Sequence, residues 1–463
     1  MMTTSMACPK SANTHSQKAT LSETISGINR RSFIRSLAAG SAILAAAKTS
    51  KGTTAPAFQV GVGYSSNPYT AASTALSACA QFPTSLAGQT VVIKPNLVVP
   101  KPSSSGATTD PNVVKAIVDM CIAAGATKIF IVEAPLPGNG PYWGPCGYAA
   151  IFTAKAYPQV TLTNLVTGTY VLTPVPGGGS AYQQMYVPSI VLEPNTFFIS
   201  AGKLKTHVDA VATLSMKNLV GLASEPAYAT VPADTDLPRH DLHLRSINQS
   251  IIDLNMIRPI DFAVIDGVWG MEGDGPTAGT PVATNVVLAG LNAVAVDRVG
   301  LNVMEFVQNS AEATYVTYLD YASEADLGPP SFNDVALLGD TYTPFPFVPA
   351  TVPPILWAPT CTPNTISISA GGSTTIKYAI PTECFTHAAI IQDNDVTPGV
   401  TVIQTLHTFK AVKSPGESLT WNGLNSSGSP VAPGVYYAQI QAIPSPSNTA
   451  NDNYAVGRIT VTA

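Results

Sequence analysis

Residues 91–96 read Val-Val-Ile-Lys-Pro-Asn, and residues 128–132 read Lys-Ile-Phe-Ile-Val. Continuous runs of β-branched and apolar residues are typical of strands that are buried on both faces of a parallel sheet. Between the two runs, Asp110 and Pro111 predict a helix start, because aspartate is a frequent N-cap and proline suits the first helical position. The order strand, helix, strand predicts a right-handed βαβ unit.

The same alternation extends over residues 58–340. We expect further buried strands at residues 196–200, 262–265 and 286–289, and helices near Asp209 and at residues 242–254 and 293–307. Strands that alternate with helices predict an α/β domain with a mainly parallel sheet and flanking helices. Asp297 falls on an apolar helix, so we expect it to face inward and to have a partner.

The pattern changes after residue 340. Seven prolines within residues 341–363 forbid a continuous helix and favour an extended linker, which we place at residues 341–362. Residues 363–463 contain only strand-like runs separated by Gly, Pro, Asn and Ser. This region predicts a C-terminal all-β sandwich of the immunoglobulin-like type.

Charge is scarce along the whole chain of 463 residues. Only 11% of the residues are charged and 45% are hydrophobic, with a formal net charge of -5. Intrinsic disorder needs low hydrophobicity and high net charge, so the composition excludes it. A weakly acidic chain has no electrostatic attraction for nucleic acid, and we expect no nucleic-acid partner.

The N-terminal 47 residues have the pattern of an export signal. Arg30 and Arg31 precede an apolar run at residues 37–47, which ends in a run of alanines that fits an A-x-A cleavage site. This arrangement resembles a twin-arginine signal peptide; a chance Arg-Arg pair before an ordinary secretory signal is the alternative. We expect an exported protein, periplasmic, extracellular or at the cell surface. The run is too short to span a membrane, so we expect no stable anchor after cleavage.

The cysteines give little information about metals. Five remain after residue 47, and none belong to a C-x-x-C motif. Iron–sulfur clusters need clustered thiolates, so no iron–sulfur cluster is expected. Cys361 and Cys384 can either form a disulfide or remain free thiols. Sequence alone does not define the pairing, and we leave both alternatives open.

Two basic blocks follow predicted strands of the α/β domain. Lys94 and Asn96 come directly after the first strand, where α/β sheets bind ligands, and Asp110 begins the next helix. We predict that an anionic group binds there; an ion pair for Lys94 and a capping role for Asp110 are the structural alternative. The second block comprises Lys203, Lys205 and His207, with the pair Lys217 and Asn218 ten residues further on. It predicts a phosphate or carboxylate site with His207 as acid or base; a structural hydrogen bond of the histidine is the alternative.

Two further blocks contain potential metal ligands. His240 and His243 can share one helical face, but a metal there needs a third ligand from His207 or Asp266. Asp266, Glu272 and Asp274 lie at or beyond a buried strand in a glycine-rich loop, which predicts a divalent-metal site or a base. A bare Asp/Gly turn is the alternative.

Taken together, these blocks resemble a known family. The K-x-K-x-H block at residues 203–207, K-N-x-x-G at 217–221 and G-x-G-P-T at 273–277 resemble the domain of unknown function 362 family in order and spacing over about residues 58–340. Many members of that family carry a ferredoxin-type iron–sulfur segment, which this chain lacks. The resemblance implies a common site formed by the basic, His and acidic blocks, and it does not name a reaction.

The C-terminal region resembles a second family. Trp421-Asn422-Gly423, Gly428 and the run Pro433-Gly434-Val435-Tyr436 resemble the immunoglobulin-like module of flagellar hook-capping proteins (FlgD-type). In that pattern Trp and Tyr fill the sandwich core and Gly and Pro form the turns. The resemblance implies an accessory domain without catalysis, and we expect it to provide contact with a cell-surface partner.

These observations predict an exported enzyme or cofactor-binding protein that acts on an anionic small molecule. The residues expected to take part in catalysis are His207, Lys205, Lys217 and Asp266, and those expected to bind the ligand or cofactor are Lys94, Asn96, Asp110, Lys203 and Asn218. Glu272 and Asp274 are the expected ligands of a divalent metal. The alternative is a non-catalytic secreted binding protein or cell-surface scaffold.

Overall fold

The computed structural model describes residues 58–79, 81–136, 142–229, 239–306, 315–392, 400–447 and 452–463. The predicted signal peptide at residues 1–47 lies outside these residues. None of the helices among them is both long enough and apolar enough to cross a membrane.

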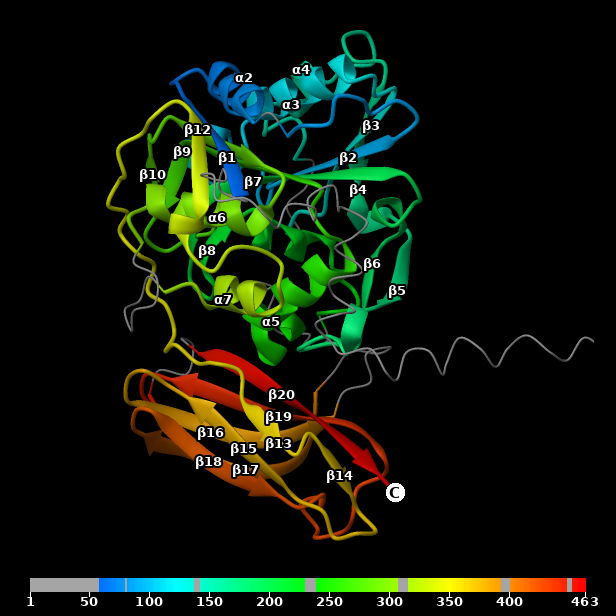
Figure 1. The fold of residues 1–463 in the computed structure, drawn as a ribbon, viewed down its shortest axis with the longest axis vertical. Coiled ribbons are helices and arrows are strands. Elements are labelled where there is room, and N and C mark those ends of the chain that lie inside the picture. Colours follow the sequence, from blue (N-terminus) through cyan, green and yellow to red (C-terminus); the bar gives the residue numbers. More distant parts are fainter. Residues whose placement is uncertain are drawn as a thin grey trace, which may run out of the picture. The chain divides into compact units, whose positions relative to one another are not determined.

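A ten-stranded sheet forms the centre of the α/β domain (Figure 1). Its main path has the strand order β12-β1-β11-β9-β7-β2-β3-β4, while β10 pairs with β9 and β8 pairs with β7. The strands are β1 (Phe58–Tyr64), β2 (Thr90–Pro95), β3 (Lys128–Glu133), β4 (Val160–Asn164), β7 (Thr196–His207), β8 (Val211–Leu214), β9 (Phe262–Glu272), β10 (Thr280–Val282), β11 (Val286–Gly290) and β12 (Val335–Gly339). A separate hairpin joins β5 (Tyr170–Pro174) to β6 (Gln184–Pro188).

The sheet is largely parallel, as predicted. Strands β9, β7, β2, β3 and β4 pair in parallel, and so do β1 and β12. On the main path only β11 runs antiparallel to its two neighbours. The predicted βαβ unit is present as β2, α3 (Pro111–Ala123) and β3, with Asp110 as the N-cap of the helix.

Helices cover both faces of this sheet. Val91 and Ile93 belong to one core cluster with α2 (Pro68–Ala78), α3 and α4 (Tyr148–Ile151), whereas Val92 belongs to a second cluster. That second cluster contains α5 (His240–Ile257), α6 (Ala293–Val303) and α7 (Thr317–Glu324). Because successive side chains of a strand point to opposite faces, the apolar run 91–93 supplies both cores, and the strand is buried on both sides.

Two predictions about elements were wrong. The strand predicted at residues 196–200 continues as β7 to His207, because Lys203 lies beside Asp266 of β9 and the charged block therefore has partners inside the sheet. No helix begins near Asp209: the chain forms strand β8 and then a 3-10 helix, η6 (Lys217–Leu222).

The C-terminal residues form a separate all-β group. One sheet has the order β13-β15-β18 and the other β14-β20-β19-β16-β17. The strands are β13 (Thr360–Thr362), β14 (Thr365–Ser367), β15 (Thr374–Ala379), β16 (Cys384–Gln392), β17 (Thr401–Val412), β18 (Gly416–Trp421), β19 (Gly434–Ile443) and β20 (Asn453–Thr462). Trp421 and Tyr436 lie in its core with ring centroids 5.5 Å apart, as expected from the Trp and Tyr motif. Cys361 and Cys384 are free thiols, so the disulfide considered between them is not formed.

Asp297 has the partners that its apolar helix led us to expect. Its carboxylate accepts hydrogen bonds from the backbone N–H of Ser215 at 2.8 Å, from the Ser215 hydroxyl, and from the backbone N–H of Met216 at 3.0 Å. The side chain is completely buried on α6. These bonds attach the turn at Ser215 and Met216, directly before Lys217, to the core of the domain.

We predict that the unfolding free energy of the wild-type protein falls relative to that of Asp297→Asn as the pH rises from about 4 to about 7. Burial raises the pKa of Asp297 from 3.8 to about 7. Within this window the folded protein therefore binds more protons than the unfolded chain, and stability falls with pH by about 1.4 kcal/mol per pH unit. Urea denaturation of both proteins at each pH measures the difference. Parallel pH profiles of the two proteins between pH 4 and 7 would contradict the prediction.

Candidate functional site

A pocket of about 170 Å³ lies at the edge where the parallel strands end. Lys94 and Asn96 from the end of β2, Glu133 from the end of β3, and Lys205 and His207 from the end of β7 line it. The further lining residues are Val98, Ala134, Leu136, Val208, Asp209, Thr213, Lys217, Asn218, Val220, Gly221, Arg239, His243, Pro276 and Thr277. The carboxyl edge of a parallel sheet is the usual position of ligand sites in α/β domains.

Lys94 forms an ion pair with a carboxylate, which was the structural alternative to ligand binding given for this residue. Its ammonium lies 2.7 Å from Glu133 Oε1 and also donates to Asn218 Oδ1 and to the Pro95 carbonyl, each at 3.2 Å. Burial lowers the pKa of Lys94, while Glu133 opposes the shift. An ammonium has three N–H groups, so these oxygens satisfy all of its donors.

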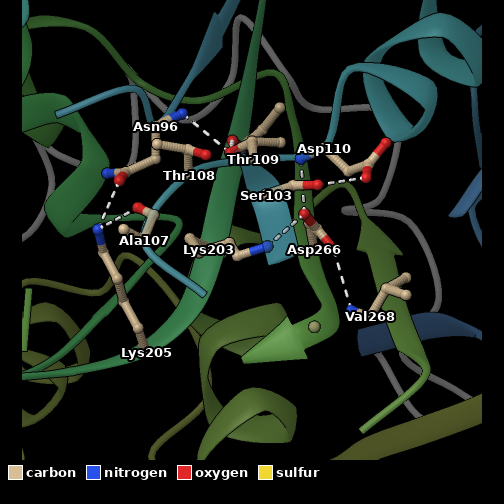
Figure 2. Close-up of polar contacts among 12 residues, drawn as sticks. Asn96, Ser103, Ala107, Thr108, Thr109, Asp110, Lys203, Lys205, Asp266 and Val268 are labelled. Carbon is tan, nitrogen blue, oxygen red and sulfur yellow. Dashed lines mark hydrogen bonds and ion pairs between the residues drawn. The ribbon is translucent and has the colours of Figure 1, made fainter. Parts of the chain in front are cut away.

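Lys205 is likewise surrounded by oxygens. Figure 2 shows its ammonium between Asn96 and Ala107, with bonds of 2.8 Å to Asn96 Oδ1 and 2.6 Å to the Ala107 carbonyl. A third bond of 3.1 Å reaches the Pro276 carbonyl. All three acceptors are uncharged, and burial together with the nearby Lys217 and Lys203 holds the pKa of Lys205 well below its usual range.

Lys203 and Asp266 form a completely buried ion pair beside the pocket. Their charged atoms are 2.7 Å apart, and Figure 2 shows that the backbone N–H groups of Asp110 and Val268 also donate to the Asp266 carboxylate, at 2.8 and 3.0 Å. The parallel register of β7 and β9 places the two residues side by side. This network therefore joins the start of α3 to strands β7 and β9.

Two glycines of the sequence motifs make room for these contacts. A Cβ atom on Gly221 would lie 2.7 Å from the Lys94 ammonium and 3.0 Å from Glu133 Oε1. A Cβ atom on Gly275 would lie 2.1 Å from the Thr206 carbonyl oxygen, next to the strand end that carries Lys205. The shortest distance at each glycine, 2.7 Å at Gly221 and 2.1 Å at Gly275, is below those of real Cβ contacts, so the K-N-x-x-G and G-x-G-P-T spacings reflect close packing around the lysines.

His207, Asp209 and His243 form a polar group on one wall of the pocket. The Nδ1 atom of His207 accepts the backbone N–H of Asp209 at 3.0 Å, and His243 Nδ1 lies 3.2 Å from Asp209 Oδ2. Burial and the nearby Lys217 hold the pKa of His207 well below its usual range. Burial disfavours ionisation of Asp209, but His243, His207 and Lys217 outweigh it and lower the pKa of the carboxyl. The group thus pairs a neutral His207 with an ionised Asp209.

Lys217 differs from the other lysines of the site. Within the described part of the chain its ammonium has no hydrogen-bond or ion-pair partner, although the side chain is only 8% exposed. Arg239 donates through Nε to the Ala223 carbonyl at 2.7 Å, but its buried Nη2 atom has no partner among the described residues, and neither has the Thr213 hydroxyl. Three polar groups that line the pocket are therefore available to a ligand.

The charge of the pocket is positive. Four basic side chains and two carboxylates line it, which leaves a formal excess of two positive charges when the histidines are neutral. Charges of one sign in a partly enclosed pocket raise the local concentration of ions of the opposite sign. The lining therefore favours an anion.

Six of the residues predicted from the sequence come together in this pocket: Lys94, Asn96, Lys205, His207, Lys217 and Asn218. Lys203, Asp110 and Asp266 lie in the adjoining ion-pair network. Glu133 was missed, although it directly follows a predicted strand and the rule that selected Lys94 would also have found it.

Glu272 and Asp274 lie outside the pocket lining and hold the proline-rich segment. Glu272 accepts the backbone N–H of Val348 at 2.8 Å, and Asp274 accepts that of Thr351 at 2.9 Å. Across the residues that the structure covers, no group of three or more His, Cys, Asp or Glu side chains is arranged to hold a metal ion. The divalent metal at Glu272 and Asp274 stays a prediction.

The geometry can be compared with known proteins. Residues 91–302 match the family model described as "Domain of unknown function (DUF362)". The matched residues include the whole pocket lining, from Lys94 to Thr277, in agreement with the resemblance seen in the sequence blocks.

One curated relative is the thylakoid-associated protein sll1697 of Synechocystis sp. (strain ATCC 27184 / PCC 6803 / Kazusa), which is 22% identical over 227 residues. The match covers 47% of this chain and 64% of the relative, so the chain spans less than two thirds of that protein. Among solved structures, the Pseudomonas fluorescens alkylpurine DNA glycosylase AlkC bound to DNA containing an abasic site analog gives a TM-score of 0.17 at 10% identity. That match covers 24% of this chain and 31% of the glycosylase. A TM-score this low carries no structural argument.

We predict that Lys203→Met destabilises the protein by about 3–5 kcal/mol, because it leaves the Asp266 carboxylate buried without its counter-ion. Adding Asp266→Asn removes the orphaned charge and restores part of the loss. Urea denaturation measures both variants. The matched control is Lys155→Met at an exposed position, which we expect to change stability by no more than about 0.5 kcal/mol. A Lys203→Met protein as stable as this control would contradict the role of the ion pair.

Proposed function

We propose that this chain is an exported protein that binds a small anionic molecule in the pocket and acts on it as an enzyme or cofactor-binding protein. One observation carries the proposal: Lys217 and Arg239 line the pocket, their side chains are more than nine-tenths buried, and neither the Lys217 ammonium nor the Arg239 Nη2 atom has a partner among the described residues. Leaving a buried charged donor unsatisfied is costly. A carboxylate or phosphate ligand relieves this cost by accepting from both groups.

The size and chemistry of the pocket limit the range of ligands that it can bind. At about 170 Å³ the pocket is smaller than the roughly 300–1,000 Å³ of sites for drug-sized molecules. Its four cations come from β2, β7, η6 and the N-cap of α5, which suits a compact anion held from several sides. The neutral His207 beside Asp209 provides a group that exchanges a proton with the bound molecule.

We predict that inorganic phosphate and succinate bind the wild-type protein and that Arg239→Met weakens binding about 10- to 100-fold, the equivalent of one charge-assisted hydrogen bond. Isothermal titration calorimetry measures the affinity, with Lys155→Met as the control of unchanged affinity. Burial lowers the pKa of Lys217 to about 8, so its positive charge is lost above that pH and binding weakens as the pH rises through 8. If neither anion binds, the non-catalytic scaffold is favoured instead.

The other regions support export and a modular arrangement. The twin arginines before an apolar run support export through the twin-arginine route. The Trp421 and Tyr436 pair in the C-terminal core supports an immunoglobulin-like accessory module of the FlgD type, which provides contact with a cell-surface partner.

We predict that replacing Arg30 and Arg31 together by lysine blocks export. The twin-arginine route requires the arginine pair, whereas an ordinary secretory signal needs only positive charge ahead of its apolar run. Cell fractionation with detection of the full chain measures the outcome. Unchanged export of the lysine variant would assign the segment to the ordinary secretory route.

A further inference from the structure

The lysines at this edge of the sheet differ in their freedom to react. Lys94 and Lys205 each donate to three oxygens, and Lys203 is held by Asp266. Lys217 lines the pocket and has no such bond within the described residues. An amine that is not held by an acceptor can turn its lone pair toward a ligand, so Lys217 is the nucleophile candidate among them.

The surroundings of Lys217 favour its neutral form. Burial lowers its pKa to about 8, and Arg239 and Lys94 contribute in the same direction, while Asp209 opposes the shift. At pH 7 about a tenth of this side chain is therefore a free amine, far more than for an ordinary lysine. Lysines that are desolvated or placed next to other cations form imines with carbonyl compounds in known enzymes.

We infer that Lys217 forms an imine with a small anion that carries a ketone or aldehyde carbonyl, of which a 2-oxo carboxylate is the simplest form. The inference rests on the proposed function, because the anionic group is the part that Arg239 anchors. It deepens that function by naming the substrate class and the atom that attacks.

The step needs no oxidant, reductant or co-reactant, and its protons move through solvent water. The Nζ lone pair attacks the carbonyl carbon, and the carbonyl oxygen takes up a proton to give a carbinolamine. The hydroxyl group then leaves as water after taking a second proton, and the nitrogen loses its remaining excess proton to give the neutral imine. Because His207 Nδ1 accepts the Asp209 N–H, the proton of its neutral ring is on Nε2, where it can donate a hydrogen bond to the carbonyl oxygen. The protons that Nζ gives up reach that oxygen through solvent water.

The experiment is reductive trapping with pyruvate and sodium cyanoborohydride, followed by peptide mass mapping. An imine at Lys217 is reduced to a stable amine, with a mass gain of one pyruvic acid less one oxygen atom. Lactate is the matched control, because it has the same carboxylate but no carbonyl. Lys217→Arg keeps the positive charge and removes the reactive amine, and circular dichroism confirms that this variant folds.

We expect modification of Lys217 at least 10-fold above that of the exposed Lys155, with none for lactate and none at position 217 in the arginine variant. The rate of trapping should rise up to about pH 8 and then level off, whereas trapping of an exposed lysine continues to rise toward its ordinary pKa. Calorimetry with pyruvate and lactate separates the two proposals. Binding without trapping at Lys217, or trapping spread evenly over all lysines, overturns the imine and leaves anion binding intact. Absence of binding by pyruvate, lactate and phosphate overturns both.

Discussion

The constraint on which the site depends is the burial of four lysines at one edge of a parallel sheet. A buried ammonium is costly unless oxygens surround it. The fold meets this requirement with two ion pairs, Lys94 with Glu133 and Lys203 with Asp266, and with three neutral acceptors around Lys205. The partners come from different strands and turns, so the lysines also connect β2, β3, β7 and β9.

This requirement explains the spacing of the sequence motifs. Gly221 lies on η6, four residues after Lys217, and packs against the Lys94 ammonium, where a side chain would collide. Pro276 follows Gly275 at the point where its carbonyl faces Lys205. The basic blocks and the glycine-rich blocks therefore pack against each other, and much of their spacing is explained by this packing rather than by a reaction.

The sequence predicted the parallel sheet, the βαβ unit and six pocket residues, because apolar periodicity and strand ends are local features. It could not predict the pairings, since Lys203 and Asp266 are 63 residues apart and meet only through the register of β7 and β9. The same limit applies to the end of β7: a charged block normally ends a strand, and only a partner strand that supplies Asp266 allows it to continue. Asp209 and Arg239 were not predicted as site residues, because they reach the pocket from a turn and from the start of a helix rather than from a strand end.

Lys217 differs from the other three buried lysines because its ammonium has no oxygen partner among the described residues. If the cluster served only to join strands, each cation would be expected to have an oxygen partner, as Lys94, Lys203 and Lys205 have. Instead, Asp297 holds the turn before Lys217 from within the core and so positions its ammonium at the pocket rather than against a carboxylate. Arg239 Nη2 and the Thr213 hydroxyl are left open at the same cavity. Lys217 thus lacks the oxygen partner that the neighbouring lysines have, and the anion that we propose as the ligand would supply it.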